Sequence, residues 1–136
     1  METDMIKITH LKKRFGDVKA VNDLSFQVKK GELFAFLGVN GAGKSTTISI
    51  ICGQLHKDSG TVQIQGTDLD KIGRKVGTML GVVFQDSVLD KPLTVRENLK
   101  NRAALYGITG KAFEKRLREL VEIFDFGDYL NRPVGK

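Results

Sequence analysis

A glycine-rich stretch around position 40 combines residue types and spacing that suit phosphate binding. It reads Gly38-Val39-Asn40-Gly41-Ala42-Gly43-Lys44-Ser45-Thr46 and fits the pattern G-x-x-x-x-G-K-[ST]. The glycines allow the backbone to curl around an anion with its N–H groups pointing inward. Lys44 would add a cation for the β- and γ-phosphates, and Ser45 a hydroxyl for Mg²⁺. The stretch therefore predicts a nucleoside triphosphate ligand.

The segments on either side of this loop have the character needed to position it. Residues 33–37, Leu-Phe-Ala-Phe-Leu, form a continuous apolar run that is typical of a parallel strand buried on both faces. Residues 46–52 continue as a buried segment, expected to be a helix whose positive N-terminal end faces the phosphates, although periodicity alone does not separate helix from strand. The alternative is an ordinary flexible turn before a lysine. A chance match in this order of elements is improbable, and we favour the phosphate loop.

The remaining pattern before position 90 predicts mainly strands. Alternation predicts half-buried strands over 5–9, 18–28 and 61–66, with turns at 15–17 and 29–32. A second buried strand is expected over 79–84. Residues 68–76 have apolar positions at helical spacing and predict a brief surface helix.

Two helices are expected after position 90. Thr94 and Glu97 form a candidate capping box for a helix that stops at Gly107, and a second helix is expected over 111–124 with Gly127 as its stop. Its charges predict the i,i+4 pairs Glu114 with Arg118, Lys115 with Glu119, and Arg118 with Glu122. The order of elements predicts an α/β fold with an antiparallel β appendage.

Composition indicates one soluble globular domain. The 136 residues are 40% hydrophobic and 28% charged, with no apolar run near the roughly 18 residues of a membrane span, and the acidic start does not resemble a signal peptide. We therefore expect a cytosolic chain. The net charge of +6 is dispersed, and the short basic run 12–14 is interpreted as a solvated surface rather than a nucleic-acid track. Cys52 is expected to pack internally, and His56 to be a surface residue without a metal role.

Four features in order and spacing resemble the nucleotide-binding domain of ATP-binding cassette (ABC) proteins. Phe15 occupies the place of the family's adenine-stacking aromatic, and the phosphate loop follows as G-V-N-G-A-G-K-S-T. Residues 82–86, Val-Val-Phe-Gln-Asp, are similar to the family's Q-loop. Residues 93–99, Leu-Thr-Val-Arg-Glu-Asn-Leu, are similar to the start of its helical subdomain. The resemblance covers nearly the whole chain.

The resemblance implies a P-loop NTPase core, present in part, with an antiparallel β subdomain and a helical subdomain from about residue 87. It implies ATP and Mg²⁺ as cofactors, Lys44 and Gln85 in catalysis, and Ser45 and Gln85 as metal ligands. The nucleotide would be bound by Phe15 and by the loop residues Gly38, Val39, Asn40, Gly41, Ala42, Gly43, Lys44, Ser45 and Thr46. Two simpler interpretations stay open: Phe15 as a hydrophobic strand end, and Gln85 as the end of a strand.

The family's signature motif, Walker B strand, catalytic glutamate and switch histidine have no counterpart in the 136 residues. We therefore expect the N-terminal portion of a single cassette domain that is inactive alone, because phosphoryl transfer depends on positioning and charge stabilisation. In the complete protein the resemblance implies ATP hydrolysis that powers membrane transport, with a transmembrane permease and a second cassette as partners at the cytoplasmic side of the membrane, and no direct nucleic-acid contact. The alternatives are a soluble cassette ATPase acting on ribosomes or DNA, and a non-hydrolysing nucleotide-binding fragment.

Overall fold

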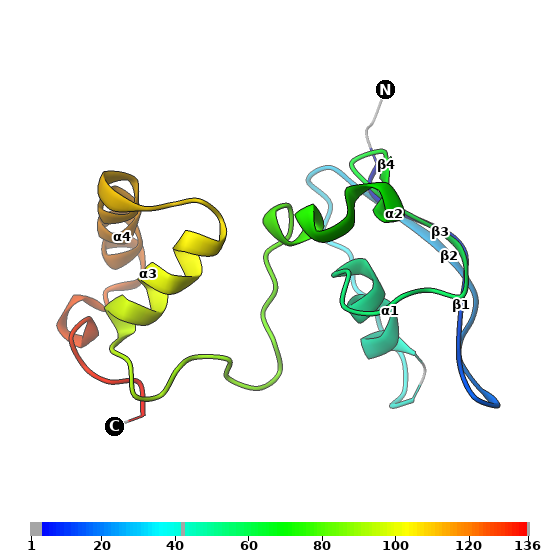
Figure 1. The fold of residues 1–136 in the computed structure, drawn as a ribbon, viewed down its shortest axis with the longest axis horizontal. Coiled ribbons are helices and arrows are strands. Elements are labelled where there is room, and N and C mark those ends of the chain that lie inside the picture. The colour runs from blue at the N-terminus through cyan, green and yellow to red at the C-terminus, as the bar shows by residue number, and fades with distance from the viewer. Residues whose placement is uncertain (1–3, 42, 136) are drawn as a thin grey trace. The chain divides into compact units, whose positions relative to one another are not determined.

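The computed structural model describes residues 4–41 and 43–135, which form two compact units (Figure 1). The first unit extends to Gly81 and contains the β-sheet, and the second begins at Val82 and contains a pair of helices. The phosphate loop belongs to the first unit. No helix in the described ranges is long and apolar enough to span a membrane.

The first unit is an antiparallel sheet with helices packed on one face. Strands β1 (Asp4–Phe15), β2 (Val18–Lys29), β3 (Ser59–Ile64) and β4 (Thr67–Asp68) pair in the order β2-β1-β3-β4. Helices α1 (Lys44–Ile51) and α2 (Leu69–Ile72) bury Ile50, Ile51 and Leu69 against it. The shared core consists of Ile8, Leu11, Val21, Ile50, Ile51, Val62, Ile64, Leu69 and Val76. The strands expected at 5–9, 18–28 and 61–66 are confirmed, with changed bounds.

A paired irregularity in β1 and β2 explains why β1 is longer than alternation predicts. His10 and Asp23 each have positive φ, 51° and 60°, and the register shifts between the pairs Ile8↔Phe26 and Leu11↔Leu24. An extra residue in a strand reverses which face the following side chains occupy. Leu11 is thereby buried three positions after Ile8. The bulge is closed by His10 Nδ1 and Asp23 Oδ1 at 2.6 Å, a contact that lowers the Asp23 pKa.

The apolar run 33–37 is not the buried strand that its sequence predicts. None of its residues is in a strand, and Leu33 and Leu37 are 99% and 85% exposed. Only one side of the run is packed, because the rings of Phe34 and Phe36 lie 4.9 and 5.4 Å from that of Phe26. A strand exists by pairing with a neighbour, and no neighbour pairs with this run among the described residues.

The strand predicted over 79–84 is likewise wrong, since this segment has no strand pairing and Val83 is fully exposed. The division between the two units falls inside it, after Gly81. The helix predicted over 68–76 is replaced by α2 followed by a 3-10 helix, Gly73–Thr78. Gly73 interrupts the α-helix because its φ of +57° is not helical.

The second unit contains α3 (Val95–Leu105), α4 (Gly110–Phe124) and a 3-10 turn, Gly127–Tyr129. Phe113 and Leu117 of α4 are buried, at 4% and 3% exposure. The predicted end of α3 at Gly107 agrees with the structure, in which Gly107 follows the helix with a φ of +74°. The stop of α4 was predicted at Gly127, but Asp125 ends the helix in the left-handed conformation.

Polar contacts fix the start of α3. The capping box is confirmed: Thr94 Oγ1 accepts from the Glu97 backbone N–H, and a Glu97 carboxylate oxygen accepts from the Thr94 N–H at 2.8 Å. The buried Asn98 amide accepts from Asp90 N at 2.8 Å and donates to the carbonyl oxygens of Asp90 and Thr94, both at 3.0 Å. Asn98 therefore ties the segment before the helix to its first turns.

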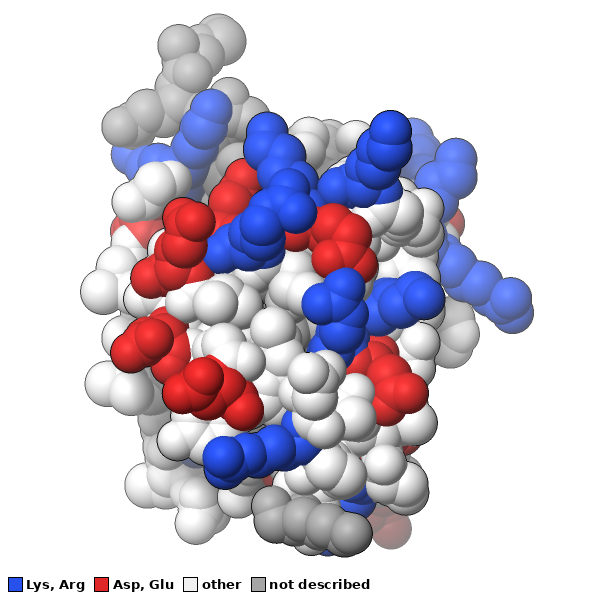
Figure 2. Space-filling model, turned by 90° about the vertical axis from the view of Figure 1, so that its left-hand side faces the viewer, with Lys and Arg blue, Asp and Glu red and all other residues white. Residues whose placement is uncertain are grey.

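Charges in this unit pair differently from the i,i+4 prediction. Glu114 binds Arg96 of α3 at 2.6 Å rather than Arg118, and Glu119 pairs with Arg116 at i,i+3. The tertiary contact prevails because α3 brings a guanidinium up to Glu114. On the face shown in Figure 2, basic and acidic side chains are interspersed.

Thr94→Ala should destabilise α3 by about 0.5–2 kcal/mol, the usual cost of losing an N-cap. Thr109→Ala is the matched control, since Thr109 caps α4 without a side-chain hydrogen bond and should cost less. Urea unfolding followed by circular dichroism measures both. Equal losses would show that the capping box contributes nothing particular.

The hydrogen bonds from Thr94 lower the pKa of Glu97. The stability that the Glu97 carboxylate contributes is therefore complete above the ordinary glutamate pKa and is lost as the pH falls through the lowered value.

Candidate nucleotide-binding site

The glycines of the predicted phosphate loop take conformations that side chains disfavour. Gly41 and Gly43 both have φ of +85°, in the left-handed region. Gly43 is the N-cap of α1 and offers no side-chain cap, and the first turn of α1 carries no acidic residue. The positive end of α1 is therefore suited to an external anion.

A close approach between backbones fixes the loop on the sheet. A Cβ atom at Gly43 would lie 2.1 Å from the Ala20 carbonyl oxygen of β2 and 3.3 Å from a Val21 methyl carbon. Only glycine fits this position. The contact sets the distance between the start of α1 and the strand beside it.

Helix α1 is held at both ends. Thr47 is fully buried, and its backbone N–H and its hydroxyl both donate to the Gly43 carbonyl oxygen at 2.9 Å. Ile50 and Ile51 anchor the last turn in the core. The segment 46–52 is thus confirmed as helical through Ile51, and the half-buried Cys52 follows as the C-cap, its thiol pKa raised by burial.

The Lys44 side chain folds back onto the phosphate loop that precedes it. Its ammonium donates to the carbonyl oxygens of Gly38 and of Val39, the latter at 2.7 Å. Each of these bonds is to a neutral oxygen, and a charged phosphate oxygen is a stronger partner for an ammonium. The side chain is therefore already at the loop where the β- and γ-phosphates are predicted to bind.

The loop and the start of β2 enclose a small cavity of about 200 Å³. Its lining consists of Val18, Ala20, Asn40, Gly41, Gly43, Lys44, Ser45 and Thr46. Val18 pairs across the hairpin with Phe15, a residue that is 51% exposed. The loop and the Phe15 side chain thus belong to one continuous part of the first unit.

Two predicted site residues lie outside the described part of the first unit. Ala42 lies outside the described residues, and Gln85 is an exposed residue of the second unit. The metal role of Gln85 stays a prediction. Ser45 is exposed beside Lys44 at the cavity, and no group of three His, Cys, Asp or Glu residues in the described ranges could hold a metal ion. The Ser45 hydroxyl fits a Mg²⁺ ion that is held mainly by nucleotide phosphates and water, which is the usual mode of Mg²⁺ binding.

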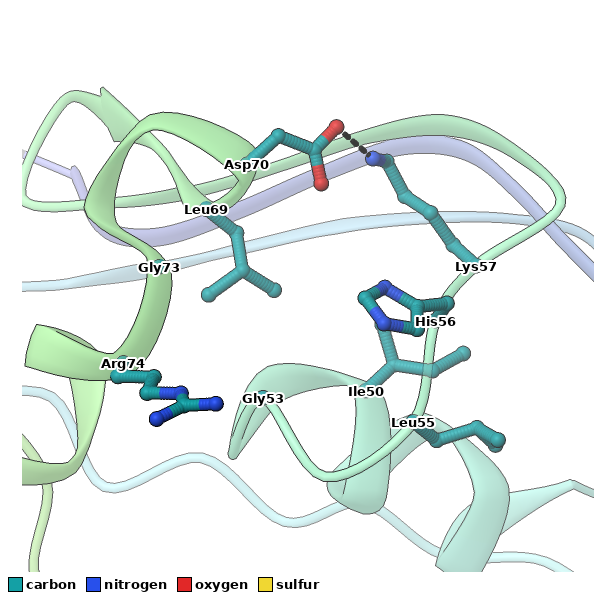
Figure 3. A pocket seen from close by; sticks show the side chains of 9 residues that line it. All are labelled: Ile50, Gly53, Leu55, His56, Lys57, Leu69, Asp70, Gly73 and Arg74. Atoms are coloured by element: carbon teal, nitrogen blue, oxygen red, sulfur yellow. Dashed lines mark hydrogen bonds and ion pairs between the residues drawn. The ribbon is translucent and has the colours of Figure 1, made fainter.

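A larger cavity of about 410 Å³ lies in the same unit and has no lining residue in common with the cavity at the phosphate loop, except Gly-free segments aside (Figure 3). It is lined by Ile50 of α1, by residues that follow α1, and by α2 and the turn after it. Leu69 and Arg74 point into it, while Lys57 and Asp70 pair at its edge. It faces the C-terminal end of α1, where the helix dipole is negative and disfavours phosphate. His56 at this cavity is exposed, as expected.

A glycine loop pressed onto a strand, leading into a helix with a lysine at its start, defines the P-loop class of nucleotide-binding proteins. The sequence profile of the ABC transporter family matches residues 21–136, and the chain belongs to that family. A solved ATP-binding subunit of an ABC transporter superposes with a TM-score of 0.84 at 29% identity, covering 95% of this chain and 54% of the other. This likeness confirms the fold class expected from the sequence.

Curated relatives agree on the family. The chain is 39% identical over 120 residues to the probable multidrug ABC transporter ATP-binding protein YbhF of Escherichia coli, covering 88% of this chain and 21% of that protein. It is 41% identical over 118 residues to the linearmycin resistance ATP-binding protein LnrL of Bacillus subtilis, covering 87% and 38%. It is 36% identical to the NatA ATP-binding protein of the same species, covering 96% and 55%. The chain thus spans about half, or less, of these relatives' lengths.

Gly43→Ala should be far more damaging than Gly41→Ala. Both substitutions place a Cβ atom at positive φ, which costs about 1–2 kcal/mol, but only at Gly43 would that atom meet backbone. The forced shift should add about 1–3 kcal/mol and abolish ATP binding. Urea unfolding and calorimetric titration measure these effects. Equal losses of stability and affinity for the two variants would contradict the close approach.

Proposed function

We propose that this chain binds MgATP through residues 38–46 and that the complete protein hydrolyses ATP to power transport across a membrane. The observation that carries the proposal is the position of Gly43. Because Gly43 is held against β2, the start of α1 and Lys44 line one cavity with Val18, the strand partner of the exposed Phe15. A triphosphate with a flat base fits this order of groups.

Each site residue has a role in this proposal. The loop N–H groups, including that of Ala42, and the Lys44 ammonium would bind the β- and γ-phosphates, and Thr46 would line the site as in the cavity observed. Ser45 and Gln85 would hold Mg²⁺, which supplies charge neutralisation on the phosphate oxygens. Gln85 would also orient the attacking water. Phe15 would stack on the adenine, contributing shape without reading its hydrogen-bonding edges.

The names of the relatives support transport over the ribosomal and DNA alternatives. They include multidrug, Nod factor export and linearmycin resistance proteins. We therefore propose a transmembrane permease and a second ATP-binding domain as partners, at the cytoplasmic side of the membrane. We also propose that residues 1–136 are the N-terminal portion of a single ATP-binding domain, with the helical subdomain from about residue 87.

Binding without turnover is the expected behaviour of the chain. No apolar strand ending in Asp-Glu follows the loop in its sequence, so the chain lacks the carboxylate that would activate water. Phosphate release by the 136-residue chain should equal that of Lys44→Ala, while calorimetry detects ATP binding only with Lys44 present. Turnover above that of Lys44→Ala would place the catalytic base among residues that we have not assigned.

Phe15→Ala should weaken ATP binding by about 1–3 kcal/mol, the usual value of a base stacked on an aromatic ring. ATP and GTP should compete similarly, because a stack does not read base edges. The matched control is Tyr129→Ala, since Tyr129 is 52% exposed and also lies under a cation, Arg132, at 4.9 Å. Calorimetric affinities that are unchanged for Phe15→Ala would make Phe15 a structural residue only.

A further inference from the structure

We infer that Asp58 is a positioning residue for base recognition, acting through Lys13 on the Phe15 ring. The inference rests on the proposed stacking of the base on Phe15. Asp58 lies just before β3 and does not line the cavity at the phosphate loop. Its contacts reach the end of β1, where Phe15 is the last residue.

Asp58 is attached to three consecutive residues of β1. One carboxylate oxygen binds the Lys13 ammonium at 2.8 Å, and the other accepts from the Arg14 backbone N–H at 2.7 Å. The Asp58 N–H donates to the Lys12 carbonyl oxygen at 3.0 Å. Both side-chain oxygens and the backbone are thus used, so the carboxylate has a fixed place beside β1.

The contact with Lys13 leads directly to the aromatic ring. The Lys13 side chain is only 14% exposed, which is unusual for a lysine, and its ammonium lies 5.4 Å from the centre of the Phe15 ring. A cation at this distance from an aromatic face is attracted to it. One face of the ring is therefore occupied, while the ring as a whole stays half exposed and can receive a base on its other face.

Asp58 carries its negative charge at neutral pH. The hydrogen bonds from Lys13 and from the Arg14 backbone lower the pKa of Asp58. Its carboxylate thus stays ionised at neutral pH, and Lys13 keeps its partner.

Strand registration does not need this side-chain pair. Lys12 already pairs with Ser59 in the β1–β3 ladder, and the backbone bond from Asp58 to Lys12 extends that attachment. The additional bond to the Lys13 ammonium acts beyond the ladder, on the side chain that contacts Phe15. A ring held in advance loses less conformational freedom when a base stacks on it, and such preorganisation raises affinity.

The test compares ATP with inorganic tripolyphosphate, which has the phosphates but no base. Asp58→Asn keeps an oxygen for the Arg14 N–H and removes the charge that holds Lys13. Lys13→Met keeps an unbranched apolar stem and removes the cation. Each variant of the 136-residue chain should bind ATP about three- to tenfold more weakly by calorimetry, with unchanged affinity for tripolyphosphate.

The matched control is Asp70→Asn. Asp70 pairs with Lys57 as Asp58 pairs with Lys13, but it lines the larger cavity and not the cavity at the phosphate loop. This variant should bind both ligands like the unmodified chain. If it weakens ATP as much as Asp58→Asn does, the effect is a general loss of surface charge pairing and the inference is wrong.

Other outcomes separate this inference from the proposed function. If Phe15→Ala weakens ATP selectively and Asp58→Asn and Lys13→Met do not, base stacking stands and the positioning role is rejected. If Asp58→Asn weakens both ligands equally, Asp58 supports the fold and not the ring, which also rejects it. If Phe15→Ala binds ATP normally, base stacking fails and the inference fails with it.

Discussion

The approach of Gly43 to the Ala20 carbonyl oxygen is the constraint on which the site depends. No side chain separates the two backbones, so the start of α1 lies directly on β2. The core residues at the end of the helix then fix its direction. A loop that binds anions through backbone N–H groups needs this rigidity, because its donors must stay aimed when no ligand is bound.

The same contact brings the sheet up to the cavity at the phosphate loop. The end of β2 that touches the loop starts at Val18, which pairs with Phe15 across a tight hairpin turn. The antiparallel sheet therefore pairs Phe15 with a residue that lines the phosphate-loop cavity, although some 25 residues separate Phe15 from the loop in the sequence. Helix α1 gives the two cavities opposite electrostatic character, because its positive end faces the loop and its negative end faces the larger cavity.

Local signals were enough to predict much of this arrangement. The glycines of the loop, the helix after it and the Thr94–Glu97 capping box follow from residues close together in the chain. The bulge at His10 and Asp23 did not follow, because two positive φ values on paired strands have no signature in either strand alone. The burial of Asn98 and its hydrogen bonds to the segment before α3 were not predicted, since an amide side chain in a mainly polar helix is normally expected to be exposed. The run 33–37 was predicted as a buried strand because its composition is apolar, but strand formation depends on a partner that no local pattern supplies.

The most direct test is an amide NMR titration of the chain with MgATP. Binding at the loop predicts the largest chemical-shift changes at Gly41, Gly43 and Ser45, with smaller changes at Phe15 and Val18. It predicts little change at Gly53 and Leu69, which line the larger cavity. Changes concentrated at Gly53 and Leu69, with the loop amides unmoved, would contradict the assignment of the nucleotide site.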